Sequence, residues 1–346
     1  KLPECMRLSE NLTAQPASKL HLTGLLGSGF SFVTRSLFTQ TELPFLLVFN
    51  NKEEAAYYLN DMEQLVGEKD VLFYPASFRR PYQIEETDNA NVLLRAEVLN
   101  RINSRKKPAV IVTYPEALFE KVVTRKELDK NTLKVAVNDK ISIDFINEVL
   151  FEYEFKRVDF ITEPGEFSVR GGIVDVFSFS NDNPYRIEFF GNEVESIRTF
   201  DVATQLSIET KKKITIIPNV ENSFFQENRE SFLDYISPQT VIFIQNTELL
   251  LADLDKQFGK AEEAFAKLSQ EIKRATPEQL FLNQASFIKR ALDFSVVEWG
   301  SKAIFKTSKT FPFHFQPQPS FNKQFDLLLN NLNENHFNGY KNYLFC

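Results

Sequence analysis

The stretch that decides the fold is HLTGLLGSGFSFVTRSLF, residues 21–38. Gly24, Gly29 and Ser31 have the spacing of the motif G-x-x-x-x-G-K-S/T, in which backbone amides cradle phosphates and the lysine reaches the outer phosphate oxygens. Phe30 occupies the position of that lysine. The stretch therefore predicts a degenerate phosphate loop between a strand and a helix.

The missing lysine removes most of the affinity that such a loop has for a triphosphate. At about 4 Å and an effective dielectric near 20, one charge pair is worth roughly 4 kcal/mol, which a benzyl group does not supply. We therefore interpret Gly24, Gly27 and Gly29 as retained turn geometry. A weakly bound anion at the helix N-terminus is the alternative.

Short apolar runs alternate with segments of helical period from about residue 18 to 120, as in a parallel sheet with crossover helices. The glycine loop lies at the first strand-to-helix turn of this doubly wound pattern. Strands are expected at 19–24, 45–50, 70–75 and 108–115, and helices after the glycines and at 52–67 and 88–103.

Around residue 140 the period changes to that of a small antiparallel domain. A helix at 142–155 precedes strands expected at 157–162, 166–179, 184–190, 193–200 and 211–219, and Gly191–Asn192 is a two-residue hairpin signal. The helix-and-strand pattern then returns, with a buried strand at 239–244, long helices over 248–274, a capping box at 276–279 and a helix and strand from 325 onward.

The composition restricts the kind of protein. The net charge of -7 and pI near 5.3 disfavour a broad surface that tracks nucleic-acid phosphates. Cys5 and Cys346 cannot form a disulfide framework or thiolate cluster, and His21, His314 and His336 lack metal-ligand spacing, so no metal site is expected. No long apolar run or secretion signal is present, which predicts a cytoplasmic protein without membrane contact.

A longer pattern appears at residues 163–205, EPGEFSVRGGIVDVFSFSNDNPYRIEFFGNEVESIRTFDVATQ. This run resembles the segment shared by the excision-repair helicase UvrB and the transcription-repair coupling factor Mfd. The resemblance extends more weakly over residues 18–320. It implies a degenerate P-loop fold of the RecA and helicase type, in two sequence halves, with the small α+β antiparallel domain inserted between them.

Three departures separate the chain from a working UvrB. Phe30 replaces the loop lysine. A helicase needs an acidic pair on a later strand to hold Mg²⁺, but the strand that resembles that place is followed by Gln245, Asn246, Thr247 and Glu248. Residues 72–100 run almost directly into a helix, without room for the aromatic hairpin with which UvrB clamps DNA.

These departures make the chain similar to the N-terminal UvrB-homology module, domains 1a, 2 and 1b, of the Mfd family. The corresponding boundaries are 1–120 for the first half of the nucleotide fold, 121–210 for the small domain, 211–320 for the second half and 321–346 for the start of a further, truncated domain. The resemblance implies that the fragment is no enzyme, has no cofactor and recruits UvrA in nucleotide excision repair.

The same resemblance implies that the parent protein is an ATP-dependent translocase. Its motor, with ATP and Mg²⁺, and its contacts with RNA polymerase and double-stranded DNA would lie beyond residue 346. The alternative function is a UvrB-type ATP-dependent repair helicase with an atypical phosphate loop. Autonomous DNA binding is a third interpretation, which the acidic charge disfavours.

The candidate partner site lies on the strand YRIEFF, residues 185–190. Strand alternation puts Arg186 and Phe190 on the face opposite the core, and Arg170 on the neighbouring strand can reach that surface. Arginine and aromatic side chains dominate interface hot spots, and in the family the matching residues contact UvrA. The alternative is that Arg186 pairs with Glu188 or Glu195 while Phe190 packs under the hairpin.

Overall fold

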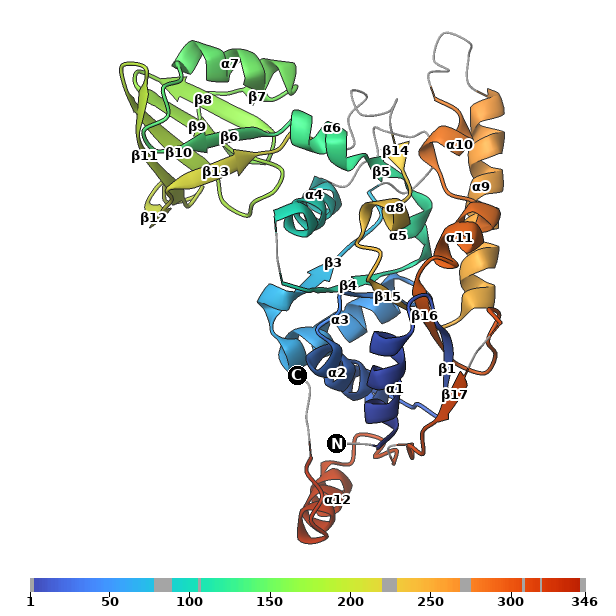
Figure 1. Cartoon of the computed structure of the whole chain (residues 1–346). Coiled ribbons are helices and arrows are strands. Elements are labelled where there is room, and N and C mark those ends of the chain that lie inside the picture. The colour runs from blue at the N-terminus through green and yellow to red at the C-terminus, as the bar shows by residue number, and fades with distance from the viewer. Residues whose placement is uncertain are drawn as a thin grey trace.

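The computed structural model describes residues 3–77, 89–104, 107–219, 229–267, 275–306, 309–317 and 319–342. Figure 1 shows a large α/β body, a small β-rich body joined to it, and helix α12 (Phe325–Phe337) apart from both. The fold class expected from the sequence is confirmed, because one body is a parallel sheet between helices and the other is a mainly antiparallel sheet.

The large body is built on a parallel sheet with the strand order β17-β1-β16-β15-β2-β4-β3. Strand β1 comes from the first sequence half and lies between two strands of the second half, so the halves interleave. The strands are β1 (Lys19–Thr23), β2 (Phe45–Val48), β3 (Val71–Phe73), β4 (Val110–Thr113), β15 (Val241–Ile244), β16 (Ser295–Trp299) and β17 (Lys309–Pro312).

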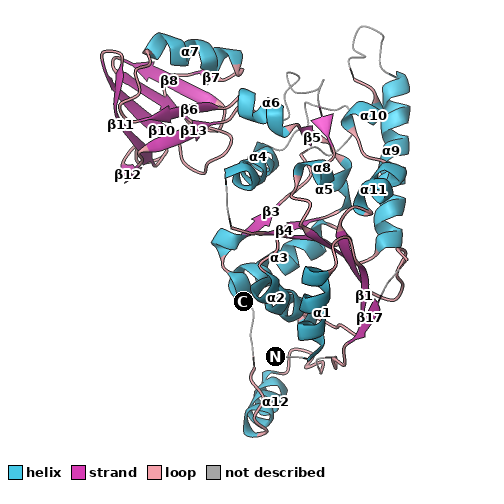
Figure 2. Ribbon diagram, viewed as in Figure 1, coloured by secondary structure: helices cyan, strands magenta, loops and turns pink. Residues whose placement is uncertain are grey.

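Helices cover both faces of this sheet, as apolar parallel strands require. Helices α1, α2 and α3 pack together on one face, and the helices that follow β3, β4 and β15 lie on the other (Figure 2). Their bounds are α1 (Pro3–Ala14), α2 (Gly29–Thr41), α3 (Lys52–Val66), η1 (Glu68–Asp70), α4 (Asn89–Ser104), α5 (Pro115–Phe119), α8 (Phe232–Tyr235), α9 (Thr247–Lys267), α10 (Pro277–Leu280) and α11 (Gln284–Ala291).

The small body is a sheet with the order β12-β11-β10-β9-β8-β7, together with helix α7 (Ile143–Glu152) and the antiparallel pair of β6 (Leu133–Ala136) with β13 (Lys213–Ile216). The turn Gly191–Asn192 joins β10 to β11, as expected. The strands are β7 (Lys156–Arg157), β8 (Glu166–Arg170), β9 (Ile173–Val176), β10 (Tyr185–Phe190), β11 (Glu193–Phe200) and β12 (Ser207–Thr210).

Two short elements join the small body to the large one. Strand β5 (Val122–Val123), where the chain leaves the large body, pairs antiparallel with β14 (Arg229–Glu230), where it returns. Helix α6 (Arg125–Lys130) follows β5 on the outgoing chain, and Thr124 caps it by accepting from the Glu127 N–H at 3.2 Å. The inserted body is therefore held at both its connections.

The expected strand over 157–162 is wrong beyond its first residue. Only Lys156–Arg157 forms a strand, and it pairs parallel with β8. The chain then turns because one carboxylate oxygen of Glu166 accepts from the backbone N–H groups of Thr162 at 2.7 Å and Glu163 at 3.2 Å. The run 166–179 is two strands, because Gly171, with φ +58°, makes a turn inside it.

Of the elements expected after residue 248, some are present and others are not or lie outside the described residues. Helix α9 runs to Lys267, while residues 268–274 lie outside the described residues. The capping box is present, and the Gln279 side chain accepts from the Thr276 N–H at 2.8 Å. Residues 340–342 are not a strand, and 343–346 lie outside the described residues, as do 78–88 of the segment expected to lack a DNA-clamping hairpin.

Among the described residues, none of the helices has the length and apolarity to cross a bilayer. Nor does this part of the chain bring together three or more side chains of the kinds that ligate metals. Helix α1, which the sequence analysis did not predict, packs against α2 with its buried Leu8 and Leu12.

An aromatic cluster around Phe30 joins the two sequence halves at the end of β1. The Phe30 ring stacks on Trp299 with the ring centres 3.8 Å apart and the planes 15° apart. It meets Phe49, Tyr58 and Phe243 edge-on at 5.8–6.1 Å. Two of these partners, Trp299 and Phe243, follow the inserted small body in sequence, so the cluster packs residues from both halves together.

We expect Phe30→Ala to lower the free energy of unfolding by about 3–5 kcal/mol, because Phe30 is 2% exposed and its removal leaves a cavity among four rings. Urea denaturation followed by Trp299 fluorescence measures the change. Phe325→Ala, at a ring that is 75% exposed, is the control and should stay within about 0.5 kcal/mol. Equal effects of the two substitutions would contradict the packing described here.

Candidate functional site

The glycine loop is packed against a later segment of the same chain. Gly24 has φ +74°, and a Cβ there would lie 1.9 Å from the carbonyl oxygen of Phe313. A Cβ on Gly29, the first residue of α2, would lie 2.9 Å from the ring of Phe315. Gly24 is therefore required by the close approach of the Phe313 backbone, and a side chain at position 29 would displace the Phe315 ring, whatever the loop binds.

The two side chains after Gly29 point into the protein. Phe30 fills the aromatic cluster, and Ser31, which is fully buried, donates from Oγ to the Asp61 carboxylate at 2.8 Å. In a working loop these positions would hold the lysine and the hydroxyl that meet phosphate and Mg²⁺. Here both side chains make contacts within the fold.

The residues after β15 are engaged in local structure. Gln245 accepts from the Asn50 N–H through its side-chain oxygen at 3.3 Å, which links the ends of β15 and β2. Asn246 accepts from the Leu249 N–H at 3.0 Å and so satisfies a free donor at the start of α9. Glu248 is exposed in the first turn of that helix.

Thr247 is buried and donates to the carboxylate of Glu298, which lies at the end of the neighbouring strand β16. Glu298 also accepts from the N–H groups of Ile304 at 2.8 Å and Phe305 at 3.1 Å, and it is 2% exposed. The buried carboxylate of Glu298 therefore closes a loop of the chain.

The predicted partner residues lie on the open face of the small sheet. In β10 the core side holds Tyr185, Ile187 and Phe189, all at most 8% exposed, while Arg186 and Phe190 face the other way. Alternation thus distributes the side chains as expected. Arg170 is at the end of β8, and its opposite neighbour across the β8–β9 pair is Ile173.

Asp175 on β9 holds both arginines. Its carboxylate accepts from Nε and Nη2 of Arg186 at 2.7 and 2.8 Å, and from Nη2 of Arg170 at 2.6 Å. Asp175 is 1% exposed, so these bonds are shielded from water. The hydrogen bonds that Arg186 donates to Asp175 raise the pKa of Arg186 above its usual value. Asp175 is not among the site residues predicted from the sequence, although an acid flanked by two valines in a strand is a usable signal.

The two arginines differ in how much of the side chain is exposed to solvent. Arg186 stacks over the Phe200 ring at 4.3 Å, donates to the Gln205 side chain at 3.1 Å and is only 14% exposed. The Arg170 side chain is 43% exposed. Arg186 therefore stabilises the surface, and Arg170 leaves more of its side chain accessible to solvent.

Phe190 is 81% exposed at the end of β10. The preceding N–H, that of Phe189, donates to the carbonyl of Gly172 at 2.8 Å, and a Cβ on Gly172 would be 3.0 Å from the Phe189 oxygen. This close approach sets the turn between β8 and β9 beside the end of β10. Arg170 and Phe190 are therefore at the same end of the sheet.

A second ion pair flanks this surface. Glu188 accepts from Ser196 Oγ and from the Arg198 guanidinium, the latter at 2.6 and 3.0 Å. The Ser196 hydrogen bond, followed by those from Arg198, lowers the pKa of Glu188. Arg186 thus pairs with Asp175 and not with Glu188 or Glu195, and Phe190 does not pack under the hairpin, so neither part of the alternative arrangement is present.

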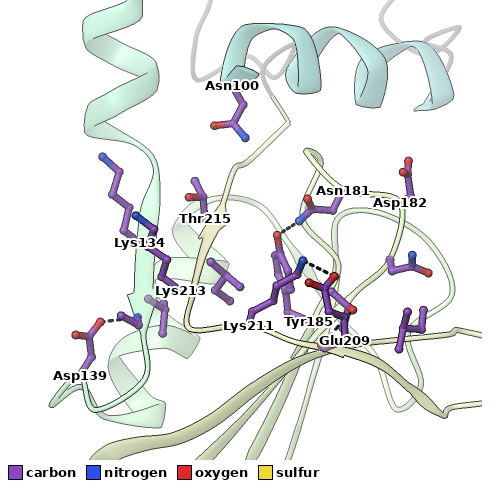
Figure 3. A pocket seen from close by; sticks show the side chains of 16 residues that line it. Asn100, Lys134, Asp139, Asn181, Asp182, Tyr185, Glu209, Lys211, Lys213 and Thr215 are labelled. Atoms are coloured by element: carbon purple, nitrogen blue, oxygen red, sulfur yellow. Dashed lines mark hydrogen bonds and ion pairs between the residues drawn. The ribbon is translucent and has the colours of Figure 1, made fainter. Parts of the chain in front are cut away.

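A cavity of about 720 Å³ lies elsewhere, between the β6–β13 pair, β12 and α4 (Figure 3). Lys134 and Lys213 reach it from the two paired strands, and Asn100 faces them from α4. Lys211 pairs with Glu209 at 2.6 Å on another wall. The lining mixes both signs of charge and does not include Arg170, Arg186 or Phe190.

Comparison with known proteins finds a family model and several relatives to which this chain is similar. The family model described as the UvrB interaction domain matches residues 133–221, which include the whole small sheet. The transcription-repair-coupling factor of Bacillus subtilis (strain 168) is 34% identical over 201 residues, or 58% of this chain. The chain is similar to the UvrB-homology module of these factors. This confirms the resemblance inferred from residues 163–205.

Two further relatives show how far the similarity extends. The transcription-repair-coupling factor of Myxococcus xanthus is 28% identical over 217 residues, 61% of this chain. The UvrABC system protein B of Ureaplasma parvum is 26% identical over 261 residues, 70% of this chain and 39% of its own length. The chain spans 17–18% of the length of the two coupling factors named here.

We expect Asp175→Asn to lower the free energy of unfolding by about 1.5–3 kcal/mol, because Arg186 loses a bidentate charged partner in a mostly buried place. Urea denaturation at neutral pH measures it. Glu209→Gln is the matched control, since Glu209 pairs with Lys211 while 63% exposed, and its cost should be below about 1 kcal/mol. An Asp175→Asn variant as stable as the control would contradict the role given to Asp175.

Proposed function

We propose that this chain is a non-catalytic, UvrB-like module that recruits UvrA in transcription-coupled nucleotide excision repair. The observation that carries the proposal is the exposed pair of Phe190 and Arg170 on the open face of a domain that matches the UvrB interaction domain. Relatives that match over more than half of this chain have names that refer to the coupling of transcription with repair.

The geometry of this face suits protein binding. An apolar ring that is 81% exposed can be desolvated by a partner, and the adjoining guanidinium can pair with an acidic group. Asp175 fixes the arginines before binding, so little side-chain entropy remains to be lost in the complex. Phe190 and Arg170 contact the partner in this proposal, while Arg186 positions Arg170 through their shared carboxylate.

The nucleotide fold supports a scaffold in place of an enzyme. Phe30 and Ser31 make contacts inside the protein, Gly29 lies under Phe315, and Glu298 closes a loop. We therefore propose that the fragment has no ATPase activity and needs neither ATP nor Mg²⁺. The acidic net charge disfavours autonomous binding to DNA.

The parent protein in this proposal is a cytoplasmic, ATP-dependent translocase on double-stranded DNA that acts on stalled RNA polymerase. Those activities would belong to regions outside the 17–18% of the relatives that this chain covers. Helicase chemistry of the UvrB type is the second candidate, favoured by the match over 70% of the chain to UvrABC system protein B.

Alanine at Phe190, Arg170 or Arg186 should each weaken binding of purified UvrA by about 2 kcal/mol or more, which is roughly 30-fold in Kd. Phe190→Ala and Arg170→Ala leave partner groups without an apolar or charged contact, and Arg186→Ala removes the group that positions Arg170 through Asp175. Fluorescence anisotropy of the labelled chain with UvrA measures Kd, and a rise of Kd with salt is expected because guanidinium groups take part.

Phe145→Ala and Lys211→Ala are the controls for this measurement. Phe145 is exposed on α7, and Lys211 is half-buried beside β12, where it pairs with Glu209. The two control variants and Phe190→Ala should keep the wild-type melting temperature. Arg186→Ala should lower it, because the buried Asp175 loses its bidentate partner, so the Kd of that variant is measured well below its melting temperature. Wild-type affinity for UvrA in both Phe190→Ala and Arg170→Ala would rule out this surface.

A fluorescent ATP analogue at micromolar concentration should not bind the chain, and Phe30→Lys should not create binding or DNA-stimulated hydrolysis. The lysine would enter an aromatic cluster, and the acidic pair after β15 would still be missing. Isothermal titration with and without Mg²⁺ measures it. Tight Mg²⁺-dependent binding by the wild type would favour the helicase.

A further inference from the structure

We infer that Phe160 is a second aromatic anchor of the surface formed by Arg170 and Phe190, and that the partner contacts all three side chains together. This inference rests on the proposed function. Phe160 is 66% exposed in the loop between β7 and β8, and its ring lies against the Arg170 guanidinium, whose central carbon is 5.2 Å from the ring centre.

The loop that carries Phe160 is fixed on both sides of the ring. The Val158 N–H donates to the Phe167 carbonyl at 2.9 Å, and Ser168 Oγ donates to the carbonyl of Asp159 at 3.1 Å. The next residue, Ile161, is 3% exposed. The Phe160 ring is thus exposed to solvent on a loop whose backbone is hydrogen-bonded to β8.

The far end of the loop is bonded through Glu166. Its carboxylate accepts from the Thr162 N–H, the Thr162 hydroxyl and the Glu163 N–H at 2.7, 2.9 and 3.2 Å. Glu166 is 7% exposed, which shields these bonds. Because the loop is ordered before binding, placing the Phe160 ring in a complex costs little conformational entropy.

The three side chains lie at the same end of the small sheet. Phe160 contacts Arg170 at the end of β8. The Gly171–Gly172 turn lies between Arg170 and the end of β10, where the exposed Phe190 is the last residue. Strands β8 and β10 are separated by β9, which corresponds to about 10 Å. The sheet therefore presents a cation between two apolar rings.

This order of charge and apolar surface describes the matching patch on the partner. Asp175 accepts hydrogen bonds from both arginines and so offsets part of their charge. Arg170, whose side chain is 43% exposed, is the cation of the surface formed by Phe160, Arg170 and Phe190. The complementary patch is an acidic side chain flanked by two apolar recesses. We assign that patch to UvrA, because Arg170 and Phe190 are the residues proposed to bind it.

The test is the Kd of UvrA for Phe160→Ala. We expect it to weaken on the order of ten-fold with an unchanged melting temperature, because the ring is mostly exposed. Phe160→Leu, which keeps apolar bulk, should recover part of the loss. Phe145→Ala is the matched control, since α7 packs with its buried Ile146 and Leu150 toward the core of the small body and exposes Phe145.

A double variant separates direct contact from an effect through Arg170. Phe160→Ala in the Arg170→Ala background should still weaken binding several-fold if the ring touches UvrA. No further loss in that background overturns the inference. An unchanged Kd for Phe160→Ala beside a weakened one for Phe190→Ala also overturns it and leaves the proposed function in place, whereas unchanged values for the Phe160, Arg170 and Phe190 variants overturn both.

Discussion

The stack of Phe30 on Trp299 is the contact on which the arrangement of the molecule depends. Phe30 comes shortly after the first strand, and Trp299 ends β16 after the chain has left the large body, formed the small one and returned. Since β1 lies between β16 and β17, the large sheet cannot close until both halves are present. A cation at position 30 would have to be desolvated in this cluster, so packing and phosphate binding exclude each other there.

The need to bring both halves into the large sheet also determines how the small body is connected to the large one. Its two connections to the large body are paired at β5 with β14, and its own β6 pairs with β13, so the insertion leaves and returns along neighbouring paths. Closing the large sheet therefore fixes where the small sheet begins. The face of β8 to β10 that bears Arg170 and Phe190 is therefore carried by a domain whose two connections are paired with each other.

Much of this could be predicted from local sequence patterns. The continuous apolar run at β2 predicts a strand buried on both faces, and the alternation in β10 predicts which of its faces is buried. Gly191–Asn192 predicts the hairpin turn. Long-range closure could not be predicted in this way. The Phe315 ring packs against Gly29, a contact between residues far apart in sequence. The loop after β7 depends on hydrogen bonds to the Glu166 carboxylate, which the sequence pattern does not reveal. Arg170, Arg186 and Phe190 could be chosen by alternation and by resemblance, but Asp175 required the register of three strands.

The pairing of charges on the open face determines how it can bind. Arg186 has Asp175, and Arg198 has Glu188, so most of the charge is balanced within the sheet before any partner arrives. Balanced charges contribute mainly to orientation and specificity, because a new partner would have to compete with bonds already formed. The affinity must then come from surface that is still exposed to water, which here means aromatic rings and the exposed part of the Arg170 side chain. An ordered face with few free charges and large exposed rings suits a protein partner better than a polyanion, and this agrees with the acidic charge of the whole chain.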